Sequence, residues 1–256
     1  SDRQTSDLRQ GMDNIEGDVE TELSYGAFDD LIASAMFNDW ASDDTIVIGT
    51  TQKSLRLQKR FTDVGEYHEF PGCVVSSWSV TVEPNAIVTS TFSMMGKTME
   101  TTQTMTSPTA KATNSPFDSF SGYIREASSG SGLSSSENIA VVTGIDFSLE
   151  NNLEALQVVG KRQAQGLAEG RASVSGTLSA YFANSTLLDR FLNEEEAELE
   201  FQLVDNSGNS YTFYFPRIKY SGSDLSIDGE GPITQSLPFT ALVPTTAPNS
   251  AIQITR

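Results

Sequence analysis

Apolar and polar residues alternate along most of this chain, which is the pattern of β-strands buried on one face. The clearest case is the run over residues 73–82, which a turn at Glu83–Asn85 connects to a second run over 86–95. We expect hairpins there, between 45–51 and 54–61, and between 197–204 and 210–218. Other alternating runs follow further along the chain, at residues 139–149, 172–182, 218–227 and 232–243. The pattern predicts a mainly β fold, an antiparallel β-sandwich or barrel.

Two short segments depart from this alternation and predict flanking helices. Apolar residues recur at helical spacing at Phe28, Leu31, Ile32 and Ala35. Asp29 and Asp30 fall in the first turn of this helix, where the helix dipole favours anions. Residues 185–192 predict a second helix, capped by Asn184 or Ser185.

The spacing of these elements suggests one β domain over residues 23–243, because no linker separates two balanced cores. Residues 1–22 are polar and lack a sustained period, so we expect an extended N-terminal arm that a neighbour orders. Residues 96–138 are rich in Ser, Thr, Gly and Pro, which predicts a loop-rich insertion with a short strand at 119–125. Residues 244–256 are expected to form a free or partner-bound C-terminal tail.

The chain is strongly acidic, with 34 Asp and Glu against 16 Lys and Arg and a formal net charge of −18. Nucleic-acid binding is disfavoured, because phosphates are held by Lys and Arg. The densest acidic run is Glu194–Glu196 with Glu198 and Glu200. It suggests either a solvated helix end and strand face, or a surface facing a polyanion that must not bind. The apolar runs are too short to span a membrane, and no secretory leader is expected.

Candidate chemistry is sparse, since the chain has one His and one Cys. His68 lies near Glu66 and Glu69, but without a second His it is best interpreted as a loop or interface residue. Cys73 opens an apolar strand and suggests a buried small side chain, and one Cys cannot form an internal disulfide. The acidic turn around Asp228 lacks the spacing of a calcium-binding loop. We therefore predict no enzyme, no cofactor and no metal site.

Two other classes stay open on composition alone. One is a β-sandwich that binds carbohydrate or protein, although Trp40 and Trp78 are the only tryptophans that could stack on sugars. The other is a hydrolase with paired carboxylates. A ligand screen or an activity screen separates both from a structural protein.

Several segments share their order and spacing with one known family. They are ELSYGAFDDLI at 22–32, FTDVGEYHEFPGCVV at 61–75, VTSTFSMMGK at 88–97, and GTLSAYF at 176–182 with LDRF at 188–191. Over most of residues 18–243 the chain resembles the major tail tube proteins of long-tailed (siphovirus-type) bacteriophages. The arm, the Ser/Gly-rich stretch and the C-terminal tail match this family less well.

The resemblance implies a β-sandwich with a flanking helix and a long loop, six copies of which form a ring. Rings stack into a tube through which the genome passes into the host, without specific DNA binding and without catalysis. Implied partners are further copies of the chain and the tape measure, tail terminator and distal tail proteins; no membrane is implied. The implied location is the virion tail, with the host cytoplasm during assembly.

An acidic bore would repel DNA over the screening length of about 8 Å in physiological salt. The candidate residues facing such a bore are Glu198, Glu200, Asp224 and Asp228. The candidates for contact between rings lie in the polar connection over 62–71, at Asp63, Glu66, Tyr67 and His68.

Overall fold

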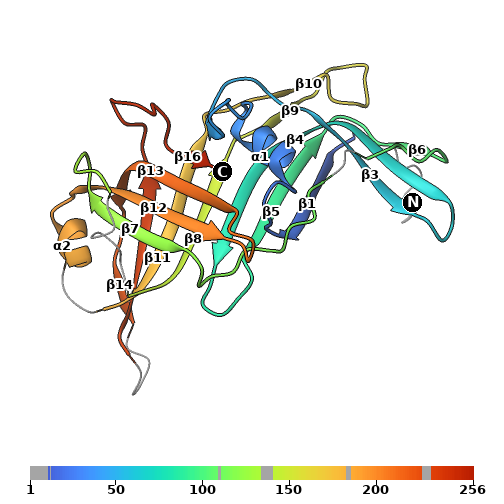
Figure 1. Cartoon of the computed structure of the whole chain (residues 1–256). Helices are drawn as coiled ribbons and strands as arrows, with labels where there is room; N and C mark the ends of the chain where they lie inside the picture. Colours follow the sequence, from blue (N-terminus) through green and yellow to red (C-terminus); the bar gives the residue numbers. More distant parts are fainter. Residues whose placement is uncertain (1–10, 12, 109–110, 134–140, 183–185, 227–231) are drawn as a thin grey trace, which may run out of the picture.

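The computed structural model describes residues 11, 13–108, 111–133, 141–182, 186–226 and 232–256. Strands dominate these residues, and two short helices, α1 (Asp29–Met36) and α2 (Thr186–Leu192), flank them (Figure 1). The strands are β1 (Ile15–Glu22), β2 (Thr45–Val47), β3 (Leu55–Phe61), β4 (Glu66–Val82), β5 (Thr89–Gly96), β6 (Glu100–Thr102), β7 (Tyr123–Ser128), β8 (Val142–Glu150), β9 (Glu154–Leu156), β10 (Gly166–Ala168), β11 (Ser173–Tyr181), β12 (Glu196–Val204), β13 (Ser210–Tyr220), β14 (Asp224–Ser226), β15 (Thr234–Ala241) and β16 (Gln253–Thr255).

One antiparallel sheet folds back on itself to make two layers. Its strand order is β1-β5-β4-β8-β11-β15-β13-β12-β7, and β9 and β10 form a separate pair. The turn between layers is at β15, which pairs with β11 along its length and with β13 at Phe239–Ala241. We call β1, β5, β4, β8, β11, β15 and β14 the first layer, and β13, β12, β7, β16 and β2 the second layer. The predicted antiparallel β-sandwich is confirmed.

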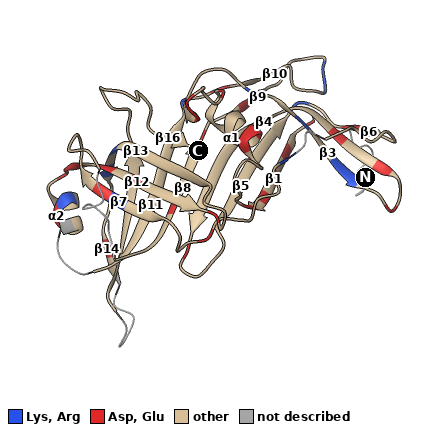
Figure 2. Ribbon diagram, viewed as in Figure 1, with Lys and Arg blue, Asp and Glu red and all other residues tan. Residues whose placement is uncertain are grey.

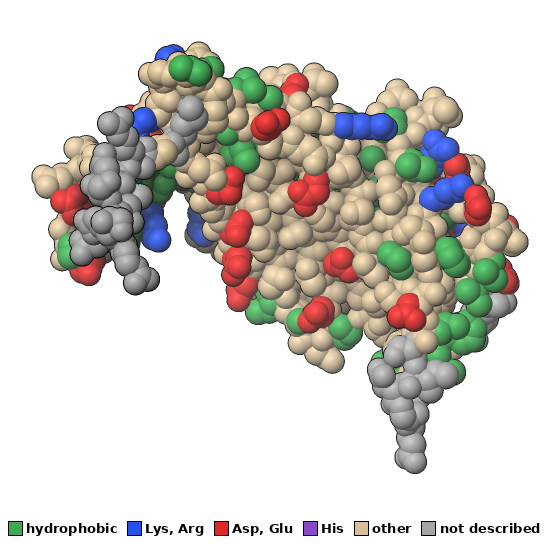
Figure 3. All heavy atoms as spheres, turned by 180° about the vertical axis from the view of Figure 1, so that it is seen from behind, with side chains coloured by type: hydrophobic (Ala, Val, Ile, Leu, Met, Phe, Trp, Pro, Cys, Tyr) green, Lys and Arg blue, Asp and Glu red, His purple; other side chains and the backbone are tan. Residues whose placement is uncertain are grey.

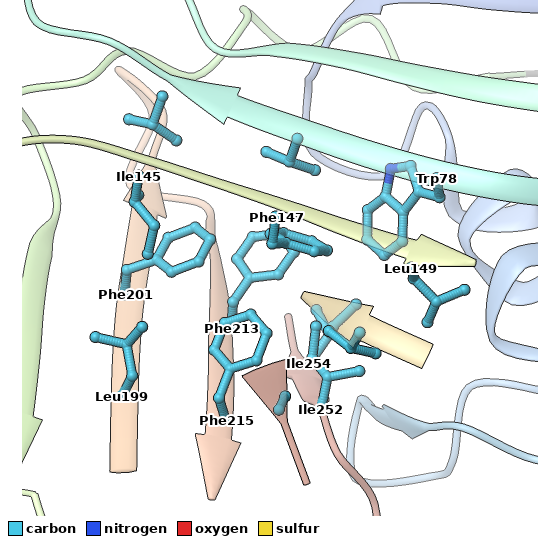
Figure 4. Close-up of a cluster of buried hydrophobic side chains, with 14 of the residues drawn as sticks. Trp78, Ile145, Phe147, Leu149, Leu199, Phe201, Phe213, Phe215, Ile252 and Ile254 are labelled. Atoms are coloured by element: carbon cyan, nitrogen blue, oxygen red, sulfur yellow. The ribbon is translucent and has the colours of Figure 1, made fainter. Parts of the chain in front are cut away.

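Aromatic side chains from both layers fill the space between them (Figure 4). Trp78 of β4 stacks on Phe92 with ring centroids 5.6 Å apart, and it meets Phe213 of the second layer at 6.2 Å. Phe147 of β8 contacts Phe213 at 5.5 Å. The Trp78 indole N–H donates to Ser90 Oγ at 2.8 Å, so the polar atom of this buried ring is satisfied.

Helix α1 forms where the periodicity predicts it, with Asp29 and Asp30 in its first turn. The Asp29 carboxylate accepts hydrogen bonds from the Tyr211 hydroxyl and the Arg256 guanidinium. The guanidinium also lies over the Trp40 ring, 4.6 Å from its centroid. These contacts fasten the helix to the second layer and to the C-terminal residue.

Within the stretch 244–256, which is expected to be a free or partner-bound tail, the last residues pack into the sandwich of this chain itself. Ile252 and Ile254 are fully buried, and β16 pairs with β13 on one side and with β2 on the other. The physical reason is the short alternation at 252–255, which places apolar side chains in the core. The prediction that 45–51 and 54–61 form a hairpin is wrong, because β2 pairs with β16 and β3 pairs with β4.

The predicted arm and insertion contain more strand than the sequence indicated. Residues 15–22 of the arm form β1, paired with β5 from Ile15↔Gly96 to Glu22↔Thr89. Within 96–138, β6 and β7 form, and β7 pairs with β12 at Tyr123–Ser128, slightly beyond the strand predicted at 119–125. The division into 1–22, 23–243 and 244–256 as separate functional parts stays a prediction.

Helix α2 confirms the prediction at 185–192, although Asn184 and Ser185 lie outside the described residues. Arg190 of α2 reaches Glu126 of β7, with Nη1 and Oε1 3.2 Å apart and both side chains largely buried. Burial raises the pKa of Glu126 to about 7; Arg190 opposes this rise and Glu195 adds to it. The buried Tyr220 hydroxyl has no hydrogen-bond partner within the described part of the chain.

Glu126 makes folding stability depend on pH in a defined direction. Its pKa in the folded chain, about 7, exceeds the ordinary value of 4.5, so the folded state binds the proton more tightly. The unfolding free energy that Glu126 contributes is therefore greatest below pH 4.5 and is lost as pH rises to about 7. We expect the unfolding free energy of the wild type, relative to that of Glu126→Gln, to fall by about 3 kcal/mol between pH 4.5 and pH 8.

Urea unfolding of both proteins at several pH values measures this difference. Glu154→Gln, which changes an exposed carboxylate, is the control and should follow the wild-type curve. A stability difference between wild type and Glu126→Gln that stays constant with pH would contradict the account.

Candidate functional site

Hydroxyl and carboxylate side chains dominate the outward surface of the first layer, and its apolar members are Val74, Met95, Tyr181 and Pro238. Strand residues alternate between the core and this surface, so every second residue of each strand contributes. We call this surface the acidic face. Its members are Glu16, Asp18, Glu20 and Glu22 of β1; Thr89, Thr91 and Ser93 of β5; Ser77, Ser79 and Thr81 of β4; Asp146, Ser148 and Glu150 of β8; Ser173, Ser175, Thr177 and Ser179 of β11; and Ser236 and Thr240 of β15.

The strand register brings these residues together on one surface. Residues directly opposite each other on neighbouring strands lie on the same face of a sheet. One row crosses six strands as Glu20, Thr91, Ser79, Ser148, Ser175 and Thr240. The adjacent row on the core side runs through Val19, Phe92, Trp78, Leu149, Val174 and Ala241. The two rows explain why the strands alternate as they do.

The acidic face carries negative charge without cations among it. No Lys or Arg occurs in β1, β5, β8, β11 or β15, or in residues 73–82 of β4. Six carboxylates lie on these strands, at Glu16, Asp18, Glu20, Glu22, Asp146 and Glu150. Seen from behind, the middle of the molecule is a broad surface with scattered acidic side chains, and Lys and Arg lie toward its rim (Figure 3).

Local contacts hold part of this charge in place. The Ser148 hydroxyl donates to Glu150 Oε1 at 2.8 Å. Partial desolvation raises the pKa of Asp146, and a hydrogen bond with Thr177 opposes that rise. Within the described residues, no group of three or more His, Cys, Asp or Glu is placed to hold a metal ion. The acidic face therefore presents a fixed negative electrostatic potential to the solvent.

The predicted bore residues do not all lie on the acidic face. Asp224 of β14 is directly opposite Ser236, so it extends the acidic face at its edge. Glu198 and Glu200 belong to β12, on the outer side of the second layer. Asp228 lies outside the described residues. The structure therefore separates the predicted group into two surfaces.

Internal hydrogen bonds occupy both glutamates of β12. Glu198 is 3% exposed, and its carboxylate accepts from the Gly132 amide at 2.7 Å and the Tyr214 hydroxyl at 2.8 Å. Glu200 accepts from the Tyr123 hydroxyl at 2.9 Å and pairs with Arg125 at 3.3 Å. These contacts tie β7, β12 and β13 together and leave little carboxylate charge for a surface.

The residues predicted to join rings lie on a projecting extension. Strands β3, β4 and β6 leave the body of the sandwich together (Figure 1), with β6 pairing at Tyr67–Glu69. Asp63 is exposed in the turn, and Glu66 accepts from Gln103 at 3.3 Å. The His68 ring meets the Phe61 ring edge-on at 5.0 Å. The structure thus groups all four residues near the tip, and their role between rings stays a prediction.

Strand β3 of this extension is basic, in contrast to the acidic face (Figure 2). Arg56, Lys59 and Arg60 lie within five residues. Arg56 pairs with Glu69 at 3.1 Å, and Lys59 lies 5.4 Å from the Phe61 ring centroid.

None of the described helices is long and apolar enough to cross a membrane.

A comparison with known protein families gives a match over nearly the whole length of the chain. A family described as "Phage tail tube protein" matches residues 1–241. A search of curated proteins found no match. One similar solved chain comes from "Cryo-EM structure of the anti-feeding prophage (AFP) baseplate, 6-fold symmetrised". It is 14% identical, with 53% of this chain and 92% of that chain covered and a TM-score of 0.34.

Proposed function

Because this chain belongs to the phage tail tube protein family, we propose that six copies join side by side into a ring and that the rings stack into the tube of a phage tail. In this arrangement the acidic face lines the bore and the genome passes along it during ejection. The protein acts as a structural subunit, without a catalytic step or a cofactor.

The observation that carries this proposal is the acidic face itself. Its carboxylates and hydroxyls span six strands without an intervening Lys or Arg. A DNA phosphate near this wall is repelled at short range, because salt screens charge beyond about 8 Å. Lys or Arg in the same positions would release counterions from DNA and hold it. The face thus suits a surface along which a polyanion slides.

The two ends of the first layer also favour a closed assembly. β1 pairs with β5 and β14 pairs with β15, and among the described residues each has one strand neighbour. Unpaired strand edges invite further pairing, and closure into a barrel removes them. A ring of copies satisfies both edges of every subunit.

The extension around Asp63, Glu66, Tyr67 and His68 is proposed to touch the neighbouring ring, since it projects from the sandwich. The other proposed partners are the tape measure, tail terminator and distal tail proteins, because the length of a tube must be set and each of its two ends must be bound by another protein. The proposed location is the virion tail, after assembly in the host cytoplasm.

Electron microscopy of the purified protein over a range of concentrations tests the proposal. We expect six-fold rings and, at higher concentration, stacked tubes, because the exposed sheet edges pair with those of other copies. Sedimentation should show a species of about six subunits. A protein that stays monomeric at high concentration, and is absent from purified virions, contradicts the proposed function.

A further inference from the structure

A groove of about 400 Å³ lies between β1 and the β3–β4 extension, under the edge of β1 that has no strand partner among the described residues and is called the free edge below. Figure 3 shows a hollow at this side of the molecule. Apolar side chains make up half of its lining, beside Glu16 and Asp18 of β1 and Gln58 and Lys59 of β3. The apolar members are Ile15, Val19, Leu57, Phe70, Cys73 and Met94.

The opposite end of the first layer carries exposed apolar side chains. Leu225 of β14 is 42% exposed and Ile233, just before β15, is 38% exposed. Leu225 is directly opposite Gln235, which is itself opposite the buried Ala180. Leu225 therefore points to the core side of the first layer, although nearly half of its surface meets solvent.

We propose that β14 of one copy pairs with the free edge of β1 of the next copy and places Leu225 in the groove. The partner is a second copy of this chain, and the inference rests on the proposed ring. The contact is head to tail, with different surfaces on the two copies. Such contacts generate closed rings when the rotation between copies closes.

Both faces of the first layer continue across this contact. Val19 is opposite the buried Phe92, so Val19 and Ile15 are on the core side of β1. Pairing β14 beside β1 puts Leu225 on that same side, above Leu57 and Phe70. Asp224 then falls on the other side and joins the acidic face. A single pairing thus buries the apolar residue and keeps the charged surface unbroken.

The strand directions specify the pairing further. Along β1-β5-β4-β8-β11-β15-β14 every neighbouring pair is antiparallel. Six such steps leave β1 and β14 pointing the same way. Rotation about a ring axis preserves that direction, so the strands meet in parallel. Parallel pairs are slightly less stable per residue, which makes the side-chain contact in the groove important.

Charge also distinguishes the two sides of the contact. No Lys or Arg occurs between Lys219 and Arg256, while Asp224, Asp228 and Glu230 lie in that stretch. The groove side carries both signs of charge, with Lys59 of β3 beside Glu16 and Asp18 of β1. Lys59 is the cation of this lining that can attract a carboxylate of the approaching copy. Asp18 and Asp224 face water on the acidic face, where salt screens their repulsion.

Leu225→Asp tests the apolar half of the contact. Leu225 is exposed in the monomer, so the variant should fold as wild type does by circular dichroism. We expect the concentration needed for ring assembly to rise at least about tenfold. Leu156→Asp, at a leucine of similar exposure on β9 (46%), is the matched control and should assemble normally. Ring assembly by Leu225→Asp at the wild-type concentration overturns the inference.

Cysteine cross-linking tests the strand pairing directly. The native Cys73 is 2% exposed, so we expect it to react much less than the two introduced surface cysteines, and the wild-type protein serves as the control for it. Asp18→Cys with Asp224→Cys should give linked multimers with a short bismaleimide. The two sites of one copy are six strand spacings apart, about 29 Å, so only neighbouring copies are linked. The control, Glu154→Cys with Asp224→Cys, should stay unlinked.

The outcomes separate this inference from the proposed function. If the cysteine variants form rings and the Asp18–Asp224 pair is not linked, the edge assignment is wrong and the tube function stands. Linkage of the Glu154 control in place of Asp18 also overturns the assignment. If the wild-type protein forms no rings, both the inference and the proposed function fail.

Discussion

Tubes built from the Asp146→Lys/Glu150→Lys variant are expected to retain DNA that wild-type tubes release. Both residues lie on β8, in the middle of the acidic face. Their replacement turns the centre of the proposed bore from anionic to cationic. Lysines that neutralise phosphates release counterions, so binding becomes favourable without any sequence preference.

The expected size of this effect follows from non-specific DNA binding. Dissociation constants of roughly 10⁻⁴–10⁻⁶ M are typical at physiological salt. With about two phosphates neutralised per site, binding should weaken about tenfold between 50 and 200 mM salt. Retention of short labelled DNA by assembled tubes measures both quantities, and wild-type tubes should retain none.

A matched control changes the same net charge elsewhere. Glu154→Lys/Glu169→Lys replaces two exposed carboxylates on the β9–β10 pair and just after it. These tubes should release DNA as wild-type tubes do. Equal retention by both variants would show that net charge matters and the acidic face does not.

Phe213→Ala is expected to cause a large loss of stability. Phe213 is fully buried, and its ring contacts those of Trp78 and Phe147 in the first layer and Phe201 and Tyr211 in the second. Truncation leaves a cavity between the layers and should cost about 3–5 kcal/mol. For a chain of this size that corresponds to a melting temperature lower by roughly 6–20 °C.

Calorimetry or denaturant unfolding checks this value against Phe120→Ala. Phe120 is 81% exposed, so its truncation should change stability by less than about 0.5 kcal/mol. If both truncations have similar small effects, the two layers are not held together by the aromatic core described above.

Local patterns predict where the helices and strands of this fold lie better than they predict which strands pair with one another. Alternation over 73–82 and 86–95 correctly indicates the β4–β5 hairpin, and helical spacing from Phe28 to Ala35 indicates α1. The pairing of Thr45 with Thr255 joins residues far apart in the sequence. Alternation shows which face of a strand is buried, but two strands with the same pattern fit many neighbours. For this reason local alternation does not reveal the burial of Ile252 and Ile254.

The acidic face was harder to predict than the strands that form it. The run Glu194–Glu196 draws attention because its charges are adjacent, whereas Asp18, Asp146 and Glu150 are isolated in sequence. They gather only when the register of six strands is known. One local signal was present, because Ser, Thr, Asp and Glu alternate with core residues in strands that lack Lys and Arg. Glu198, in contrast, is buried by Gly132 and Tyr214, which no local pattern reveals.

A cryo-electron microscopy map of the assembled protein would show which layer lines the bore. We expect a six-fold ring in which Ser79, Ser148 and Ser175 face the axis and the second layer forms the outside. A ring whose bore is lined by β12 and β13, with the strands of the first layer on its outer surface, would contradict this expectation.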